Sequence, residues 1–164
     1  MDHANFLDEL IGLLTNHRVR YCVVGGQAVN AYVEPLISLD LDLAVAVDEI
    51  EAVEALMTSH FPVEQFPNRL NVSKAGSDLR VQIQIDPRYS VFPKRASVRE
   101  VLGLQLPVAR VEDVLQGKIW AAMDPQRRAS KRRKDLLDIE RLLESYSDLR
   151  ARTPSEILDR LSQP

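Results

Sequence analysis

Two aspartates, Asp40 and Asp42, have the residue type and the spacing that metal-dependent chemistry requires. They lie in residues 39–47, where a period-two pattern predicts a β-strand with Leu39, Leu41, Leu43, Val45 and Val47 on one face and Asp40, Asp42, Ala44 and Ala46 on the other. Two carboxylates on one strand face can share a divalent cation, and hard oxygen ligands suit Mg²⁺ with phosphate partners. The alternative is an edge strand whose polar face lies in water.

A glycine pair, Gly25 and Gly26, precedes this segment and suggests that the cation would bind together with a phosphate group. Residues 20–24 form a short apolar run that predicts a strand, and residues 26–32 have the pattern of a helix. A strand, a glycine turn and a helix N-terminus together expose backbone N–H groups and the positive end of the helix dipole, which bind phosphate.

A lysine, Lys118, falls on the apolar side of a predicted helix over residues 111–123. The apolar arc of that helix consists of Val111, Val114, Leu115, Ile119 and Ala122. Burial disfavours the charged ammonium, so a lysine facing the core needs either a partner or a functional role. The alternative is that the long side chain reaches the surface.

The next predicted helix, residues 127–146, carries acidic residues on or beside its apolar face. Its apolar arc consists of Leu136, Ile139, Leu142, Leu143, Tyr146 and, beyond the helix, Leu149. Asp135 falls within this arc and Asp138 lies at its edge. Asp135 either pairs with Lys118 or an arginine to join two helices, or belongs to a catalytic site, and the two roles are compatible.

The order of these features along the chain resembles the order found in the nucleotidyltransferase superfamily typified by DNA polymerase beta. The Gly-Gly turn, the D-x-D strand and the later segments 117–122 and 134–139 are similar to its AbiEii-type branch, over roughly residues 20–147. The resemblance implies a mixed central sheet flanked by helices. It also implies transfer of a nucleoside monophosphate from a nucleoside triphosphate, with Mg²⁺ or Mn²⁺ as the cofactor.

The resemblance also implies roles for individual residues. Asp40 and Asp42 would hold the metal, and Gly25 and Gly26 would let the backbone approach the triphosphate. Ser38 stands where the family often has Ser or Thr next to the nucleotide. Lys118 would pair with phosphate oxygens, and Asp135 or Asp138 would orient it.

The sequence departs from this family at the third carboxylate, which normally projects from a later strand. The matching strand, residues 79–85, has Gln82 and Gln84 on the expected face, and glutamine is a weaker, neutral metal ligand. Asp86, on the same face at the strand end, is a candidate substitute. Either Asp86 completes the metal site, or the protein uses one metal or is inactive.

Composition narrows the class of protein. The chain has 164 residues, of which 45% are hydrophobic and 27% charged, as in a globular protein. No apolar run approaches the roughly 20 residues of a membrane span. The N-terminus lacks the pattern of a signal peptide, so we expect a cytoplasmic protein with no membrane partner. The single cysteine, Cys22, lies in the first predicted strand and is interpreted as a small buried hydrophobic residue.

The charge is unevenly distributed, although the formal net charge is only −3. Six basic residues crowd into residues 127–134: Arg127, Arg128, Lys131, Arg132, Arg133 and Lys134. Such a run is typical of a solvated helix start. Beside a nucleotidyl-transfer site it would also attract triphosphate or an RNA backbone.

The remaining pattern predicts the rest of an α/β fold. Further elements are a helix ending near residue 17, a helix over 48–60, strands over 61–66, 70–74 and 104–109, partly helical structure over 90–102, and a short helix over 154–161. We expect one compact domain, with an α/β core over residues 1–110 and a helical C-terminal part over 111–164.

Two functions remain open at this point. The first is a Mg²⁺-dependent nucleotidyltransferase acting on an RNA, protein or small-molecule acceptor, as a component of a toxin–antitoxin or phage-defence pair with a cognate antitoxin. The second is a catalytically silent module of the same fold that binds a nucleotide or a partner. The remaining alternative is a structural domain in which the arrangement of the carboxylates is a coincidence.

Overall fold

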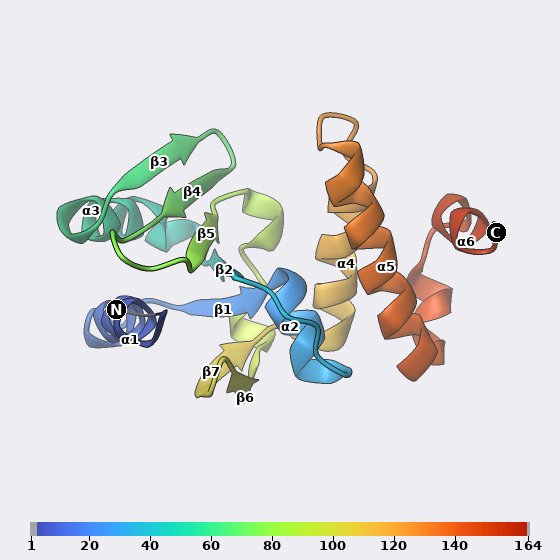
Figure 1. The fold of residues 1–164 in the computed structure, drawn as a ribbon, viewed down its shortest axis with the longest axis horizontal. Coiled ribbons are helices and arrows are strands. Elements are labelled where there is room, and N and C mark those ends of the chain that lie inside the picture. Colours follow the sequence, from blue (N-terminus) through green and yellow to red (C-terminus); the bar gives the residue numbers. More distant parts are fainter. Residues whose placement is uncertain (1–2, 164) are drawn as a thin grey trace.

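A computed structural model describes residues 3–163, so the first two residues and the last one, which the predicted domain ranges include, lie outside the described part. A seven-stranded mixed sheet with the order β3-β4-β5-β2-β1-β7-β6 forms the centre, with helices on both sides (Figure 1). This arrangement confirms the α/β class predicted from the sequence. No helix within the described range is long and apolar enough to cross a membrane.

The elements follow one another closely along the chain. The strands are β1 Tyr21–Val24, β2 Asp40–Val45, β3 Val63–Phe66, β4 Arg69–Val72, β5 Arg80–Gln84, β6 Ser97–Val101 and β7 Leu104–Val108. The α-helices are α1 His3–Asn16, α2 Gly25–Tyr32, α3 Ile50–His60, α4 Val111–Ala122, α5 Ala129–Ser145 and α6 Ser155–Leu161. Short 3₁₀ helices are η1 Val47–Glu49, η2 Pro87–Tyr89, η3 Pro93–Arg95 and η4 Ser147–Arg152.

Strand β2 lies in the interior of the sheet, between β1 and β5. It runs antiparallel to β1 and parallel to β5. The interpretation of this segment as a solvated edge strand is therefore wrong, and its aspartates face covered space. The strand is also shorter than the alternating segment, since Leu39 and Val47 lie outside it and are exposed.

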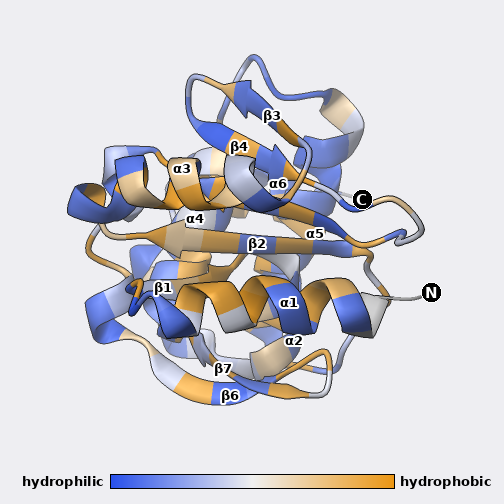
Figure 2. Cartoon of the chain, turned by 90° about the vertical axis from the view of Figure 1, so that its left-hand side faces the viewer, coloured by the Kyte–Doolittle hydropathy of each residue, from blue (hydrophilic) through white to orange (hydrophobic). Residues whose placement is uncertain are grey.

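One face of the sheet is covered by α1 and α3, which lie in front of the strands in Figure 2. Leu41 and Leu43 of β2 are fully buried in the core. Helix α1 contributes the buried side chains Phe6, Leu7, Leu10 and Leu14, whose spacing places them on one side of a helix. Phe6 meets Phe61, which follows α3, with ring centroids 5.2 Å apart. The aspartates of β2 therefore point to the opposite face.

That opposite face is covered by α2, α4 and α5 (Figure 1). Helices α4 and α5 pack against each other and both contact α2. The helices predicted over residues 111–123, 127–146 and 154–161 are confirmed within two residues at each end. The last strand ends at Val108 and α4 begins at Val111, next to the predicted division at residue 110.

The partly helical structure predicted over residues 90–102 needs correction. Only the 3₁₀ turn Pro93–Arg95 is helical there, and Ser97–Val101 forms the edge strand β6. Leu102 and Gly103 both have positive φ, 52° and 82°, and form the two-residue loop of the β6–β7 hairpin. Apolar residues at Val98 and Val101 have helical spacing, but the hairpin loop and pairing with β7 outweigh it.

Candidate active site

The two aspartates of the D-x-D segment take different partners across the sheet. Asp40 is in register with Arg80 of β5, and the Arg80 Nε donates to Asp40 Oδ1 over 2.7 Å. Asp42 is in register with Gln82 of β5 and with Val24 of β1. Gln82 is thus confirmed beside Asp42, at the place predicted from the strand pattern.

Gly25 connects the end of β1 to the start of α2 and packs against Asp42. Its φ of +69° is a left-handed conformation that glycine tolerates best. A Cβ atom here would overlap Asp42 Oδ2 and lie 2.9 Å from its Cγ. Around Gly26, by contrast, no atom lies within 4 Å of the Cβ position. At the start of α2 there is therefore free space beside the backbone of Gly26, whereas the backbone of Gly25 packs against Asp42.

The carboxylate of Asp42 has one oxygen without a partner. Its Oδ1 is buried and accepts no hydrogen bond from any described residue. Burial raises the pKa of Asp42, Lys118 lowers it and Asp40 raises it by a smaller amount, and the net result is a pKa of about 6. A buried lone pair without a donor is costly, and a cation would satisfy it. Asp40 and Asp42 thus fit a divalent cation that takes its other ligands from phosphate and water.

Lys118 is buried and lies between two carboxylates. Its Nζ is 3.1 Å from Asp135 Oδ1 and 2.8 Å from Asp138 Oδ2, and the residue is only 7% exposed. Burial lowers the pKa of Lys118, but Asp138 and Asp135 raise it more, so its pKa is above the usual value. The alternative in which the lysine reaches the surface is therefore wrong.

Two arginines that the sequence analysis did not assign to the site complete this network. Arg127 Nε binds Asp135 Oδ2 over 2.6 Å, and Arg141 binds Asp138 Oδ1 over 2.8 Å. Arg141 also donates to Asn30 Oδ1 and Glu34 O, which ties α5 to α2 and the loop after it. The sequence signal for Arg127 was its place in the basic run, and the signal for Arg141 was its i,i+3 spacing from Asp138.

A small cavity of about 60 Å³ brings most of these groups together. It is lined by Val24, Gly25, Asp42, Gln82, Gln84, Tyr89, Gly117, Lys118, Ala121, Arg127 and Asp135. Gly117 leaves room for Tyr89, because a Cβ there would lie 3.3 Å from the Tyr89 ring. Asp138 lies behind Lys118 and does not line this space.

Ser38 has a different neighbourhood from the one expected for a nucleotide ligand. Its Oγ accepts from the backbone N–H of Asp40 over 3.2 Å, and its carbonyl accepts from Gln27. It lines a separate pocket of about 370 Å³ with residues of loop 35–37 and of the β6–β7 hairpin. In this geometry Ser38 holds the start of β2.

Asp86, the candidate third carboxylate, is engaged by Arg88. It accepts from the Arg88 backbone N–H over 2.9 Å and from the guanidinium over 2.9 and 3.1 Å. Burial raises the pKa of Asp86, but these hydrogen bonds outweigh it, so its pKa is below the usual value. Asp86 lines a second cavity of about 130 Å³, next to the first and sharing Gln82, Gln84, Tyr89, Ala121 and Arg127 with it. Within residues 3–163, no three acidic, His or Cys side chains are grouped to hold a metal.

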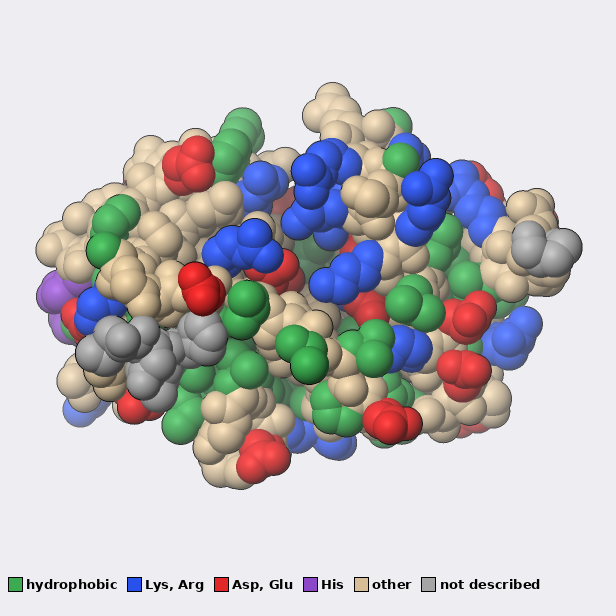
Figure 3. Space-filling view, in the orientation of Figure 1, with side chains coloured by type: hydrophobic (Ala, Val, Ile, Leu, Met, Phe, Trp, Pro, Cys, Tyr) green, Lys and Arg blue, Asp and Glu red, His purple; other side chains and the backbone are tan. Residues whose placement is uncertain are grey.

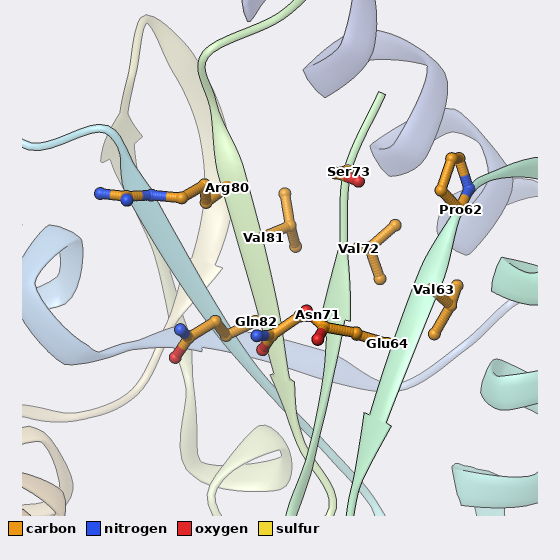
Figure 4. Close-up of a pocket in the computed structure, with 9 residues that line it drawn as sticks. All are labelled: Pro62, Val63, Glu64, Asn71, Val72, Ser73, Arg80, Val81 and Gln82. Carbon is orange, nitrogen blue, oxygen red and sulfur yellow. The ribbon is translucent and has the colours of Figure 1, made fainter. Parts of the chain in front are cut away.

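A third, larger hollow of about 320 Å³ continues from Gln82 over the outer strands. Gln82, Asn71 and Glu64 are register partners on β5, β4 and β3, and their side chains lie in one row (Figure 4). The hollow also includes Arg80, which extends toward β2. We call this space the strand trough.

Basic side chains surround these spaces. Figure 3 shows Lys and Arg side chains gathered at the centre of one face, between strands β3–β5 and helices α4 and α5. Arg69, Arg88 and Arg127 line the second cavity, and Arg80 lines the strand trough. In the basic run, Arg128, Arg133 and Lys134 are exposed, as expected for a solvated helix start, whereas Arg127 is drawn into the site.

Cys22 lies outside this site. It is fully buried in β1, and burial, with a smaller effect of Asp113, raises the pKa of its thiol to about 12. A thiol with so high a pKa is not a nucleophile at neutral pH, which agrees with its interpretation as a buried hydrophobic residue.

Comparison with solved structures identifies the class of fold. The crystal structure of ANT(2″)-Ia in complex with adenylyl-2″-tobramycin has a TM-score of 0.65 at 11% identity, over 96% of this chain and 98% of that one. Lincomycin-bound LnuA, a lincosamide antibiotic adenylyltransferase, has a TM-score of 0.52 at 13% identity, over 83% and 95%. A putative nucleotidyltransferase from Thermotoga maritima has a TM-score of 0.52 at 16% identity, over 73% and 86%. The fold is that of a nucleotidyltransferase.

Comparison with a family model identifies the branch of the nucleotidyltransferases to which the chain belongs. Residues 26–162 match the family described as nucleotidyl transferase AbiEii toxin of type IV toxin–antitoxin systems, so the chain belongs to this family. A search of curated protein sequences found no match. The resemblance inferred from the Gly-Gly turn and the D-x-D strand is confirmed.

Proposed function

We propose that this protein is a Mg²⁺- or Mn²⁺-dependent nucleotidyltransferase that moves a nucleoside monophosphate from a nucleoside triphosphate to an acceptor. The observation that carries the proposal is the unpartnered, buried Oδ1 of Asp42. Its carboxylate lies against the start of α2 on one side and shares a cavity with Lys118 on the other. A buried carboxylate oxygen without a donor is expensive to keep charged, and a divalent cation would offset that cost.

Each residue has a role in this reaction. Asp40 and Asp42 would hold the divalent cation, which would neutralise charge that develops on the phosphates. The open backbone at Gly26 receives the triphosphate, and Lys118 stabilises the leaving pyrophosphate. Asp135 and Asp138 orient the Lys118 ammonium. An acceptor hydroxyl would lose its proton to water and attack the α-phosphorus, the bond to the bridging oxygen would break, and the electron pair would leave with pyrophosphate.

We favour RNA as the acceptor over a cationic small molecule. The solved complex of ANT(2″)-Ia contains adenylylated tobramycin, an aminoglycoside. In this chain, Arg69, Arg88 and Arg127 line the cavity next to the site, and Arg80 lines the strand trough. Arg80, Arg88 and Arg127 are each paired with an aspartate. The charges that would attract a phosphate backbone and repel an aminoglycoside are therefore those of Arg69 and of the exposed residues of the basic run.

The test is a transfer assay. The protein is incubated with each α-³²P-labelled nucleoside triphosphate, Mg²⁺ and total cellular RNA and protein, and the products are separated on gels with and without RNase or protease. We expect a labelled, RNase-sensitive band that Asp42→Asn removes. Asp48→Asn is the matched control, because Asp48 lies after β2 and pairs with Arg20 at the surface. A protease-sensitive band would assign a protein acceptor instead, and a label on neither would count against the RNA proposal.

A catalytically silent module is the second candidate, and Gln82 is the observation that favours it. Gln82 stands beside Asp42 where the family resemblance implies a carboxylate, while Asp86 is bound to Arg88. Magnesium-dependent nucleotide binding in calorimetry, without pyrophosphate release, would support this candidate. Because the family is one of toxins of type IV toxin–antitoxin systems, either form is expected to act with a cognate antitoxin in the cytoplasm. Growth arrest on expression, abolished by Asp42→Asn, tests the toxin role.

A further inference from the structure

Arg80 forms an ion pair with Asp40, one of the two aspartates proposed to bind the metal ion. Its Nε lies 2.7 Å from Asp40 Oδ1, and the two residues face each other across paired parallel strands. The Arg80 backbone N–H donates to Leu39 O over 2.8 Å, which holds the residue in place beside β2. Arg80 therefore neutralises Asp40 in this structure.

The side chain of Arg80 is also mostly exposed to solvent. It is 69% exposed, against 24% for Asp40. Its guanidinium makes no other hydrogen bond among residues 3–163, and it extends away from the outer strands toward β2 (Figure 4). A planar guanidinium with this exposure is a good bidentate partner for a phosphate group.

An arginine next to Asp40 weakens metal binding, whereas a carboxylate at the same place would strengthen it. A third acidic residue on β5 would add to the attraction for a divalent cation, whereas Arg80 repels the cation and competes with it for Asp40. A triphosphate bound at the start of α2 brings negative charge that competes for the guanidinium. Nucleotide binding and metal binding would both break the Arg80–Asp40 ion pair. Each therefore favours the other, and by the same factor.

We propose that Arg80 is an internal counter-cation that makes metal binding at Asp40 and Asp42 depend on nucleotide binding. The guanidinium holds Asp40 in the free protein and pairs with a phosphate of the nucleoside triphosphate in the complex, which releases Asp40 to the metal. This inference rests on the proposed function, because it assigns the order of binding at the same site.

Arg80→Gln tests the coupling, with Arg20→Gln as the matched control. Like Arg80, Arg20 is an exposed arginine that pairs with an aspartate, but its partner Asp48 lies beyond the end of β2 opposite to Asp40. Mn²⁺ binding is measured by electron paramagnetic resonance, first without nucleotide and then with each α,β-methylene nucleoside triphosphate in turn. Asp40→Asn gives the background.

In the absence of nucleotide, Arg80→Gln should tighten Mn²⁺ binding roughly fivefold, the upper range for removing one exposed ion pair. The enhancement of Mn²⁺ binding by nucleotide should fall by the same factor, and Arg20→Gln should change neither quantity. An Arg80→Gln variant with unchanged or weaker Mn²⁺ binding would overturn the inference and make Arg80 a support for the Asp40 carboxylate. If the wild-type protein binds no Mn²⁺ even with nucleotide, the proposed function itself fails.

Discussion

Gly25 and Asp42 are in direct contact, and the contact leaves no space for a Cβ atom on the glycine. Gly25 follows β1 and Asp42 lies on the adjacent strand β2, so the first turn of α2 is packed onto the carboxylate. The phosphate-binding turn and the metal-binding aspartate of the proposed site are therefore one packed unit, although they are separated in sequence. A change at either residue alters the other.

The two glycines should respond differently to the same substitution. Gly25→Ala places an alanine at φ +69° and against Asp42, and we expect a loss of roughly 2–4 kcal/mol in the free energy of unfolding. Gly26→Ala has open space, so stability should be unchanged or rise by up to about 1 kcal/mol. Gly26→Ala should nevertheless weaken nucleotide binding, because its methyl group enters the space proposed for triphosphate. Urea unfolding and calorimetry measure both effects, and wild-type nucleotide affinity in Gly26→Ala would contradict the assignment.

Asp42 should make the protein less stable as the pH rises. Its pKa is about 6 in the folded state and near 3.8 when unperturbed, so between these values the folded state keeps a proton that the unfolded state has lost. Without metal, wild type should therefore lose roughly 2 kcal/mol relative to Asp42→Asn between about pH 4 and pH 7. The measurement is urea unfolding of both proteins in EDTA across this range. A difference that does not depend on pH would show that the Asp42 carboxyl has an ordinary pKa.

Lys118 should be coupled to Asp42 as well as to its two direct partners. Lys118, Arg127 and Arg141 balance the charges of Asp135, Asp138 and Asp42, so Lys118→Met leaves three carboxylates against two cations. We expect a loss of about 2–4 kcal/mol in the free energy of unfolding. In the double variant with Asp42→Asn the balance returns, and part of this loss should be recovered. Purely additive losses in a double-mutant cycle would place Asp42 outside the network.

The sequence predicted most of the fold and the centre of this site because both depend on local patterns. Period-two alternation identified β2, and helical spacing placed Lys118 and Asp135 on buried faces. The partly helical structure predicted over residues 90–102 is wrong over Ser97–Val101, which form β6 and depend on pairing with β7. That pairing is not visible in a local pattern.

The partners of the site residues depend on register and side-chain direction, which the sequence does not specify. Arg80 pairs with Asp40 only because β5 lies parallel to β2 with these residues opposite each other. Arg141 reaches Asn30 across more than a hundred residues of chain, through the packing of α5 on α2. Asp86 has the predicted position at the end of β5, but its hydrogen bonds go to Arg88.

Gln82 determines how much metal chemistry the site supports, and restoring a carboxylate there tests this directly. Gln82 is the register partner of Asp42, whereas Gln84 is the partner of Ala44, two register pairs further along the strands. We expect Gln82→Asp to tighten Mn²⁺ binding by about tenfold or more, because a third oxygen anion joins Asp40 and Asp42. Gln84→Asp, with the same added charge at a greater distance, should have a smaller effect.

Asp86→Asn is the complementary variant. Since Arg88 holds the Asp86 carboxylate, the loss of its charge should leave Mn²⁺ binding within about twofold of wild type. If Asp86 instead supplies the third ligand, Asp86→Asn should weaken Mn²⁺ binding as much as Asp40→Asn does, and Gln82→Asp should add little. Calorimetry of the three variants with Mn²⁺ and a non-hydrolysable nucleotide distinguishes the two outcomes. A crystal soaked with Mn²⁺ and the same nucleotide then shows whether Asp86 turns away from Arg88 to reach the metal.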